Sequence, residues 1–487
     1  MKLLELLKDL EDIEISGDIN TEINGIAYDS RKINPEDLFV CIKGLKTDGH
    51  VYIDNAIEFG ANTIVVEDPM EQIPGVVIVK VKNSRIALAT IAARFYGRPT
   101  ETMNVIGVTG TNGKTTITHI IKGILEMNGV SSGLIGTISH KILDREYKAS
   151  NTTPESLELQ KLFCEMKASK VDTCVMEVSS HSLEMNRVKG IKFNTGVFTN
   201  LTPDHMDFHG NIESYKEAKT KLFYQTTDAN IINIDDKYGK VIAKEIKELN
   251  TALITYGIKE KADIYAENIN ITPKGSSFRV TTPKFTGELF FSTPGLFSVY
   301  NALAALSVCY SLGYNFEQIK HGIESIKGVP GRFELVQNYK NRTIVVDYAH
   351  TPDALENVLN TIKEFKIGRI ITVFGCGGDR DKTKRPLMGE IVSRLSDYYI
   401  ITSDNPRTEC PETIIKDIKK GINEGEDKYR MIIDRKEAIK EAIRISEPQD
   451  VVLIAGKGHE TYQIIGDKVI DFDDKKIAQD AVMEEIE

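Results

Sequence analysis

The chain has 487 residues, which at about 100–200 residues per domain predicts three domains. Its 41% hydrophobic and 27% charged residues are typical of a globular protein, and its net charge of −10 excludes the broad positive surface with which proteins bind nucleic acid. Its apolar runs are too short to span a bilayer, and its six cysteines form no CxxC pair. We therefore expect a cytoplasmic protein with reduced thiols, no membrane insertion and no zinc site.

The first 98 residues predict a small α/β domain. Short β-rich runs at residues 25–28, 38–43, 62–66 and 76–81 precede a helical pattern at 84–96. The segment Tyr96-Gly97-Arg98-Pro99 then interrupts regular structure. It predicts a linker and a first domain of residues 1–98.

Residues 99–329 predict a central domain that opens with a strand, a Gly-rich turn and a helix. The strand covers residues 104–108, and the helix is amphipathic, with Ile117, Ile120, Ile121, Ile124 and Leu125 on one face. Asn128-Gly129 is a usual signal for the end of a helix. A further apolar strand at 173–176 leads into Glu177.

Residues 330–487 follow the break Gly328-Val329-Pro330-Gly331 and predict a Rossmann-like domain. Strands at 343–346, 370–374, 398–402 and 451–454 alternate with helices near 352–365, 386–395, 411–423 and 435–445. This alternation favours a mostly parallel sheet covered by helices, which binds ligands at the carboxyl ends of its strands. Polar or Gly-rich clusters follow all four strands, at Asp347, 375–380, 404–407 and 456–460, and predict one shared crevice.

The turn of the central domain reads Gly110-Thr111-Asn112-Gly113-Lys114-Thr115-Thr116. Between a strand and a helix, such glycines let backbone N–H groups face a phosphate, a lysine reaches the outer phosphates, and a threonine hydroxyl binds Mg²⁺. The loop differs from the common GxxxxGK[ST] pattern because Val108 stands where that pattern has its first glycine. We predict an ATP-binding P-loop; the alternative is a Gly-rich turn without a ligand.

Three further features are open on the residues alone. Glu177 is either a metal-binding carboxylate beside the loop or a solvated residue at a strand end. The segment from Asp204 to His209 holds four possible metal ligands, or is a polar loop. Lys219 lies between Lys216 and Lys221 on an expected helix, a pattern that favours a solvated lysine.

Together these segments resemble the Mur ligase superfamily along nearly the whole chain. Beside the loop, the resemblance rests on ordered motifs: Asp29-Ser30-Arg31, Asn151-Thr152-Thr153-Pro154, Met176-Glu177-Val178-Ser179-Ser180-His181, Asp204-His205, Tyr215-Lys216-Glu217-Ala218-Lys219, Tyr300-Asn301-Ala302, Pro330-Gly331-Arg332-Phe333-Glu334, Asp347-Tyr348-Ala349-His350-Thr351-Pro352, Asp404-Asn405-Pro406-Arg407 and Gly456-Lys457-Gly458-His459-Glu460.

The resemblance implies an ATP-dependent, ADP-forming ligase of peptidoglycan precursor synthesis. Such an enzyme adds meso-diaminopimelate to UDP-N-acetylmuramoyl-L-alanyl-D-glutamate through an acyl phosphate, and we expect it to act as a monomer. The three domains would hold the UDP-sugar, ATP and the incoming amino acid in turn. The alternatives are the lysine-adding ligase of the same family, a folate polyglutamylating enzyme, and a GTPase-like switch, for which we find no NKxD-like guanine reader.

The resemblance also implies roles for individual residues. Ser30, the Leu45-Lys46-Thr47 region, Asn151, Thr152, Thr153, Ser179 and Arg187 would hold the UDP-muramoyl dipeptide, although Met185 replaces a glutamine that relatives often have. Asn301, Arg332 and Asp347 would contact the adenine, phosphate and ribose of ATP. Lys219 would carry a carbamate formed from carbon dioxide (N6-carboxylysine). With Glu177 and His205, this carbamate would bind one Mg²⁺, while Thr115 serves a second.

The tetrapeptide Asp404-Asn405-Pro406-Arg407 looks like the diaminopimelate type, because lysine-adding relatives usually lack the arginine. A guanidinium can bind the distal carboxylate of diaminopimelate, which lysine does not have. Arg380 would bind carboxylate in the same way, and Glu460 with the Gly456 carbonyl would receive the distal ammonium. Either His209 or His350 would help to deprotonate the attacking amine.

Overall fold

The computed structural model describes residues 1–44, 47–338, 340–423, 425 and 427–485. Leu45 and Lys46 of the predicted UDP-sugar contact lie outside the described residues. The chain forms two compact units, Met1–Asp263 with Ala304–Gly313 and Ile264–Leu303 with Tyr314–Glu487. Among the described residues, every helix is too short or too polar to cross a membrane.

The N-terminal part of the first unit is a five-stranded sheet in the order β1-β5-β4-β3-β2, in which β1 alone runs antiparallel. Its elements are α1 (Leu3–Leu7), β1 (Glu14–Ser16), β2 (Gly25–Ala27), β3 (Asp37–Val40), α2 (Ile53–Glu58), β4 (Thr63–Val66), β5 (Val77–Lys80) and α3 (Ser84–Phe95). Asn83 caps α3 by accepting hydrogen bonds from two backbone N–H groups at its start. The four predicted strands and the helix are confirmed; the short edge strand β1 was not predicted.

The remainder of the first unit is built on parallel strands in the order β13-β12-β11-β6-β10-β7, extended by the antiparallel strands β8 and β9. Its strands are β6 (Asn104–Thr109), β7 (Ser132–Ile135), β8 (Ser139–Ile142), β9 (Arg145–Lys148), β10 (Thr173–Glu177), β11 (Phe193–Phe198), β12 (Thr226–Asn233) and β13 (Ala252–Gly257). Its helices are α4 (Lys114–Met127), α5 (Ser156–Ala168), α6 (Ser180–Glu184), α7 (Met206–His209), α8 (Ile212–Thr220) and α9 (Lys237–Ile246).

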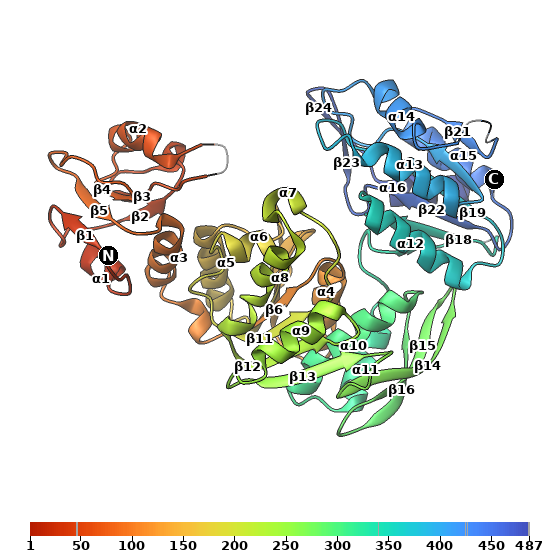
Figure 1. The fold of residues 1–487 in the computed structure, drawn as a ribbon, viewed down its shortest axis with the longest axis horizontal. Coiled ribbons are helices and arrows are strands. Elements are labelled where there is room, and N and C mark those ends of the chain that lie inside the picture. The colour runs from red at the N-terminus through yellow and green to blue at the C-terminus, as the bar shows by residue number, and fades with distance from the viewer. Residues whose placement is uncertain (45–46, 339, 424, 426, 486–487) are drawn as a thin grey trace. The chain divides into compact units, whose positions relative to one another are not determined.

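Helix α4, labelled in Figure 1, is the helix predicted after the Gly-rich turn, and it begins at Lys114, directly after Gly113. The five apolar side chains predicted on one face are all buried, which confirms the amphipathic reading. Packing of this face anchors the first turn of α4, so the position of Lys114 and Thr115 is fixed by the core rather than by the loop alone.

The second unit contains an antiparallel meander and a separate α/β sheet. The meander consists of β14 (Ile264–Thr272), β15 (Gly275–Thr281) and β16 (Thr286–Phe291), and α11 (Phe316–Ser325) packs against β16. Helix α10 (Leu296–Ser311) contributes residues to both units. Asn315 begins α11 with a capping box that it forms with Gln318.

The sheet of the C-terminal part has the order β17-β18-β22-β19-β20-β21, and within it β17 alone is antiparallel. Its elements are β17 (Glu334–Val336), β18 (Thr343–Asp347), α12 (Pro352–Phe365), β19 (Ile370–Phe374), α13 (Lys384–Leu395), β20 (Tyr398–Ile401), α14 (Pro411–Lys419), β21 (Tyr429–Met431), α15 (Arg435–Ile445), β22 (Val451–Ala455) and α16 (Asp474–Glu484). A hairpin of β23 (Tyr462–Ile465) and β24 (Lys468–Asp471) precedes α16.

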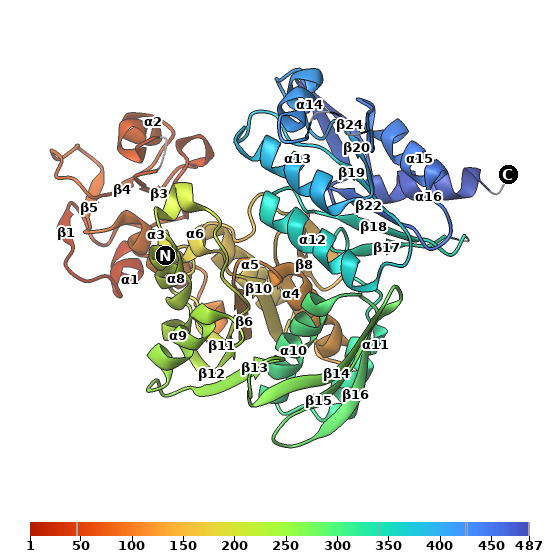
Figure 2. The same ribbon diagram turned by 45° about the vertical axis from the view of Figure 1, so that its right-hand side comes forward.

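Helices cover both faces of this sheet, as Figure 2 shows. Apolar residues of α12, α13 and α14 share one core cluster with the sheet, and those of α15 and α16 share another. Alternate strand residues, such as Val345 and Val346 of β18, belong to opposite clusters. The predicted Rossmann-like architecture and its four inner strands are therefore confirmed. The edge strands β17 and β21 and the hairpin were not predicted, and α14 ends at Lys419 rather than at residue 423.

Candidate active site

The predicted phosphate loop joins β6 to α4 and depends on two glycines. Gly110 and Gly113 have φ angles of 147° and 89°, a region that side chains rarely adopt. A Cβ atom on Gly110 would lie 1.8 Å from Thr199 Oγ1, so no larger residue fits there. Asn200 holds the loop from outside, since its carbonyl accepts from Thr111 N (2.8 Å) and its Oδ1 from Asn112 N (3.0 Å). The loop is thus a fixed cradle at the N-terminus of α4, where the helix dipole favours an anion.

Two lysines meet at one carbonyl of this loop. Lys114 Nζ donates to Gly110 O (2.9 Å) and Thr111 O (2.8 Å), and Lys219 Nζ from α8 donates to the same Gly110 O (2.8 Å). Lys219 is only 1% exposed, and its ammonium lies 4.4 Å from the centre of the Tyr215 ring. Burial, and after it the charge of Lys114, lowers the pKa of Lys219 well below its usual range. The interpretation of Lys219 as a solvated lysine, which the pattern alone favours, is therefore wrong.

Glu177 is the last residue of β10 and is 1% exposed, so the solvated interpretation is wrong for it as well. Its Oε2 accepts from Thr115 Oγ1 and from Thr137 Oγ1 (both 3.0 Å), and its Oε1 accepts from Thr137 N (2.9 Å). The structure thus brings together a carboxylate and the threonine hydroxyl of the loop. Oxygen atoms of this kind are the ligands that Mg²⁺ prefers.

Two histidines of the predicted site, His205 and His209, lie near Tyr215. His205 is half exposed and precedes α7 in a left-handed backbone conformation. The centre of its ring lies 6.4 Å from that of Tyr215 and 4.8 Å from that of His181. Burial, followed by the neighbouring His205 and His209, lowers the pKa of His181 to about 4. His209, one of the two candidate bases, is buried with Nε2 2.9 Å from Ser180 Oγ. His181 was not among the predicted site residues, although it ends one of the quoted motifs.

The predicted metal site contains few of the side chains that usually bind metals. Within the described part of the chain, no three His, Cys, Asp or Glu side chains gather in a metal-binding group. The predicted set contains two residues of those types, Glu177 and His205, and otherwise relies on Thr115 and a modified Lys219.

The predicted peptide-binding residues surround the strand end that carries Glu177. Thr153 Oγ1 donates to the Glu177 carbonyl (2.8 Å) and accepts from Ser179 N (3.1 Å). Arg187 Nη1 donates to the Thr153 carbonyl (3.2 Å). Thr152 joins the same group through a hydroxyl contact of 3.0 Å with Thr137.

The environment of Arg187 contains one residue that the sequence analysis missed. Glu155 Oε2 lies 3.3 Å from Arg187 Nε and 3.2 Å from Arg85 Nη1 of α3. Met185 Sδ lies 3.5 Å from Arg187 Nη2, so the residue that replaces the expected glutamine still contacts the arginine. Asn151 is exposed, and Ser30 is buried at the start of the 3₁₀ turn Ser30–Lys32.

Three predicted ATP contacts lie on the second unit. Asn301 is buried in α10. Asp347, at the end of β18, accepts from Phe333 N (2.7 Å) and Ala349 N (2.8 Å), and the Arg332 guanidinium lies 4.7 Å from the centre of the Tyr348 ring. Burial raises the pKa of the Asp347 carboxyl, while Arg332 and the two N–H groups oppose that shift.

The predicted ammonium site lies between the ends of β20 and β22. Asn405 Nδ2 and Lys457 Nζ donate to Oε2 of Glu460 at 2.9 and 3.0 Å. Lys457 is fully buried and also donates to Asn405 Oδ1 (3.2 Å). A Cβ atom on Gly456 would lie 2.8 Å from Asp404 Oδ2. Lys457 was missed as a site residue, although it stands inside the quoted Gly456–Glu460 motif.

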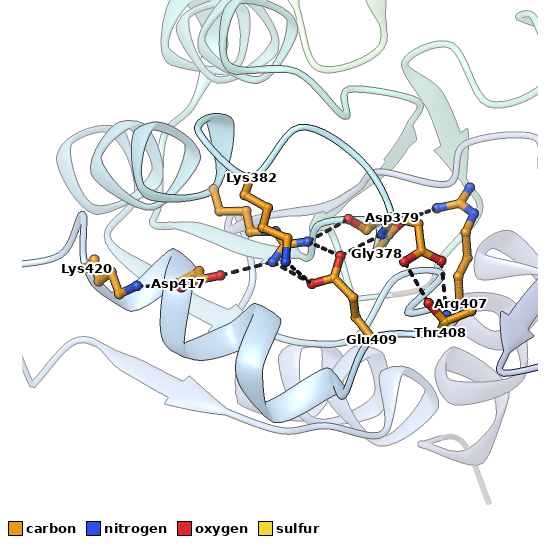
Figure 3. A network of polar contacts seen from close by, with 10 residues as sticks. Gly378, Asp379, Lys382, Arg407, Thr408, Glu409, Asp417 and Lys420 are labelled. Carbon is orange, nitrogen blue, oxygen red and sulfur yellow. Dashed lines mark hydrogen bonds and ion pairs between the residues drawn. The ribbon is translucent and has the colours of Figure 1, made fainter. Parts of the chain in front are cut away.

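The two predicted carboxylate-binding arginines flank Gly377. A Cβ atom there would lie 2.9 Å from Arg407 Nη1 and 3.7 Å from Arg380 Cγ. Arg407 is partly buried and donates from Nη1 to Gly378 O (2.8 Å), as Figure 3 shows. Its backbone N donates to Ile464 O of β23 (3.1 Å), so the unpredicted hairpin holds it in place. Arg407 is therefore held against Gly378 and the hairpin and is not a fully exposed turn arginine.

Comparison with known proteins identifies the family of this chain. Family models match residues 22–96 (Mur ligase family, catalytic domain), 108–309 (Mur ligase middle domain) and 331–458 (Mur ligase, glutamate ligase domain). An Alkaliphilus oremlandii protein named UDP-N-acetylmuramoyl-L-alanyl-D-glutamate–2,6-diaminopimelate ligase is 52% identical over 485 residues, covering 100% of this chain and 99% of that protein. The chain belongs to the Mur ligase family.

A second relative and a solved structure carry the same name. A Clostridioides difficile protein of the same name is 51% identical over 484 residues, covering 99% of each chain. A solved structure titled as a ligase of that name is 30% identical, has a TM-score of 0.74 and covers 100% of this chain and 99% of its own. The predicted family, three-part α/β fold and ligase class are confirmed.

Proposed function

We propose that the chain is an ATP-dependent ligase that adds meso-diaminopimelate to UDP-N-acetylmuramoyl-L-alanyl-D-glutamate during peptidoglycan precursor synthesis. The observation that carries this proposal is the 52% identity, over the whole chain, with a relative of that name. The enzyme acts as a monomer in the cytoplasm. The lysine-adding ligase remains the alternative, and the arginine pair beside Gly377 argues against it.

Each of the three parts of the chain binds one substrate. Residues 1–98 bind the UDP-sugar, residues 99–329 bind ATP, and residues 330–487 bind the amino acid. The ATP contacts are the loop Gly110, Thr111, Asn112, Gly113, Lys114, Thr115 and Thr116, together with Asn301, Arg332 and Asp347. The cradle at the start of α4 supports this assignment because a side chain at Gly110 would collide with Thr199 and Gly113 has a positive φ angle.

The reaction proceeds in two steps. The D-glutamyl carboxylate attacks the γ-phosphorus of ATP, forming an acyl phosphate and ADP; the amine of diaminopimelate then attacks the acyl carbon, and phosphate leaves. The first step brings a carboxylate against a polyphosphate, so cations must offset their repulsion. Lys114 supplies one cation from the loop and Arg332 another from the C-terminal part. His209 or His350 takes the proton of the attacking amine.

The residues around Glu177 fit a magnesium site. Thr115 offers a hydroxyl oxygen and Glu177 a buried carboxylate, which Thr115 and Thr137 already orient. Burial favours the neutral form of the Lys219 amine. Only a neutral amine adds to carbon dioxide, which gives a carbamate and a proton. With His205, the carbamate would complete the ligands. Two Mg²⁺ ions bound here would neutralise the charge that develops on the phosphates and the acyl oxygen.

The dipeptide substrate is held next to the loop. The residues assigned to it are Ser30, Asn151, Thr152, Thr153, Ser179 and Arg187. Thr153 supports this because it hydrogen-bonds the carbonyl of Glu177 and the N–H of Ser179, so the peptide site and the proposed metal site share one strand end. Glu155 orients Arg187 through its Nε atom, and Met185 contacts the Nη2 atom of the same guanidinium.

The amino-acid pocket follows the charges of meso-diaminopimelate. Arg380 and Arg407 bind the distal carboxylate, and Glu460 with the Gly456 carbonyl binds the distal ammonium; Asp404, Asn405 and Pro406 complete the wall. Among the described residues, Asn405 and Lys457 both donate to Oε2 of the Glu460 carboxylate, which leaves Oε1 for an ammonium. Lysine has no distal carboxylate for Arg380 and Arg407 to bind, so it forgoes charge-assisted hydrogen bonds worth about 1.5–3 kcal/mol each.

Phosphate release tests the proposal. The enzyme is incubated with ATP, Mg²⁺, bicarbonate and the UDP-muramoyl dipeptide, together with diaminopimelate, with lysine, or with no amino acid. We expect fast phosphate release with diaminopimelate, much slower release with lysine and no sustained release without an amino acid. Equal release without an amino acid would refute the ligase assignment, and faster release with lysine would support the alternative.

A further inference from the structure

The two loops that carry the arginines are bound to each other. We call residues 377–381, which carry Arg380, and residues 404–409, which carry Arg407, the arginine loops. Asp379 N donates to Glu409 Oε1 (2.6 Å), and Thr408 donates to the Asp379 carboxylate through its backbone N (3.2 Å) and its hydroxyl (2.8 Å). Figure 3 shows these contacts beside the bond from Arg407 to Gly378. Each arginine loop therefore donates to the other and accepts from it.

A buried cation anchors this junction. The side chain of Arg385 on α13 is fully buried and donates to both oxygens of Glu409, from Nη2 at 2.8 Å and from Nη1 at 3.1 Å. Its Nη1 also donates to Asp417 of α14 (3.0 Å). The bond from Arg385 and then that from Asp379 N lower the pKa of Glu409 to about 2, so its carboxylate stays charged at neutral pH. Glu409 thus connects the core of the domain to the backbone beside Arg380.

The backbone at the junction is strained. Asp379 and Arg407 both have positive φ angles, 53° and 51°, which non-glycine residues adopt rarely. Such a conformation costs on the order of 1 kcal/mol or more per residue and persists where surrounding contacts enforce it. The contacts that enforce it here are those of Thr408 and Glu409 with Asp379, and those of Arg407 with the hairpin.

We propose that Glu409 is a positioning residue for substrate specificity: it fixes the two arginine loops against each other so that Arg380 and Arg407 act together on the distal carboxylate of the incoming amino acid. The inference rests on the proposed function and deepens it. Glu409 itself touches no substrate. Its loss lets the loop of Arg380 move away from that of Arg407, so the amino acid with a distal carboxylate loses affinity while lysine, which lacks that group, does not.

A matched pair of variants separates positioning from general stability. Glu409→Ala and Asp417→Ala each remove one carboxylate from the buried Arg385, but Glu409 alone also accepts from the backbone of Asp379. The measurement is the ratio of kcat/KM for diaminopimelate to kcat/KM for lysine. We expect Glu409→Ala to lower this ratio about tenfold, through KM for diaminopimelate, as the loss of one charge-assisted hydrogen bond implies. Asp417→Ala should leave the ratio unchanged even where it lowers thermal stability.

A second pair applies if Glu409→Ala does not fold. Thr408→Val removes the exposed hydroxyl that donates to Asp379, and Thr408→Ser keeps it. We expect a lowered ratio in Thr408→Val and the wild-type ratio in Thr408→Ser. Equal ratios in wild type and in both Glu409→Ala and Thr408→Val, or equal losses in Glu409→Ala and Asp417→Ala, overturn the inference while leaving the proposed function intact. A wild-type enzyme that uses lysine as well as diaminopimelate refutes the proposed function itself, and the inference with it.

Discussion

Replacing Lys219 by methionine should separate stability from activity. The substitution removes one hydrogen bond to Gly110 O, worth about 0.5–1.5 kcal/mol, but that carbonyl keeps its bond from Lys114 at 2.9 Å. In return, a buried polar group is replaced by an apolar side chain of similar length, a change that is often neutral or stabilising. We therefore expect the free energy of unfolding to change by no more than about 2 kcal/mol in either direction.

Activity should respond very differently. Methionine cannot form a carbamate, so the site would lose the proposed anionic ligand for Mg²⁺ and with it the stabilisation of charge in the proposed phosphoryl transfer step. Loss of a single electrostatic contact of this kind commonly lowers kcat by about 10²–10³-fold, and we expect at least that reduction here. The buried lysine would then be retained for function rather than for stability.

The assay combines urea unfolding with phosphate release on the same protein preparations. Lys221→Met is the matched control, because Lys221 lies two residues further along the chain but is exposed and paired with Glu184 (2.6 Å). The control should keep wild-type activity and stability. Near-normal turnover of Lys219→Met, or an unfolded protein in its place, would contradict the reasoning.

Three further predictions follow from the site. Lys114→Ala should lower turnover at least about 10³-fold without unfolding the chain, as circular dichroism and phosphate release would show; near-normal rates refute its role at the phosphates. Arg407→Met should raise KM for diaminopimelate at least about tenfold while leaving lysine use unchanged; an equal effect on both amino acids would contradict a carboxylate contact. The pKa of Glu409 is lowered to about 2, so its contribution to stability is complete above its ordinary pKa and is lost as the pH falls toward 2. The difference in urea midpoint between wild type and Glu409→Ala should accordingly shrink between pH 6 and pH 2.5; a constant difference would contradict the charged pair.

The sequence predicts best those elements whose burial shows in the local pattern of apolar residues. The inner strands of the C-terminal sheet are continuous apolar runs because helices cover both of their faces, and α4 shows its apolar stripe. Strand β24 could not be predicted in this way. Its residues Lys468–Asp471 are all exposed, so no alternation marks it, although its hairpin holds the backbone of Arg407.

The polar site was harder to predict because burial of a charged residue is a tertiary property. Lys216, Lys219 and Lys221 look alike in the sequence, yet only Lys219 is held against the phosphate loop and the Tyr215 ring. Only the resemblance to a family marked it. Likewise Glu409 and Asp417 lie 24 and 32 residues after Arg385 in segments that share no motif with it, and the three meet because α13 and α14 pack side by side.

The enzyme is expected to select an amino acid with a second carboxylate, through Arg380 and Arg407, and to join it to the UDP-muramoyl dipeptide. The most direct measurement is the mass of the product formed when the purified enzyme receives the dipeptide, ATP, Mg²⁺ and bicarbonate with equal concentrations of meso-diaminopimelate and lysine. We predict a single UDP-muramoyl tripeptide carrying diaminopimelate. A product that carries lysine, or no tripeptide at all, would contradict the account.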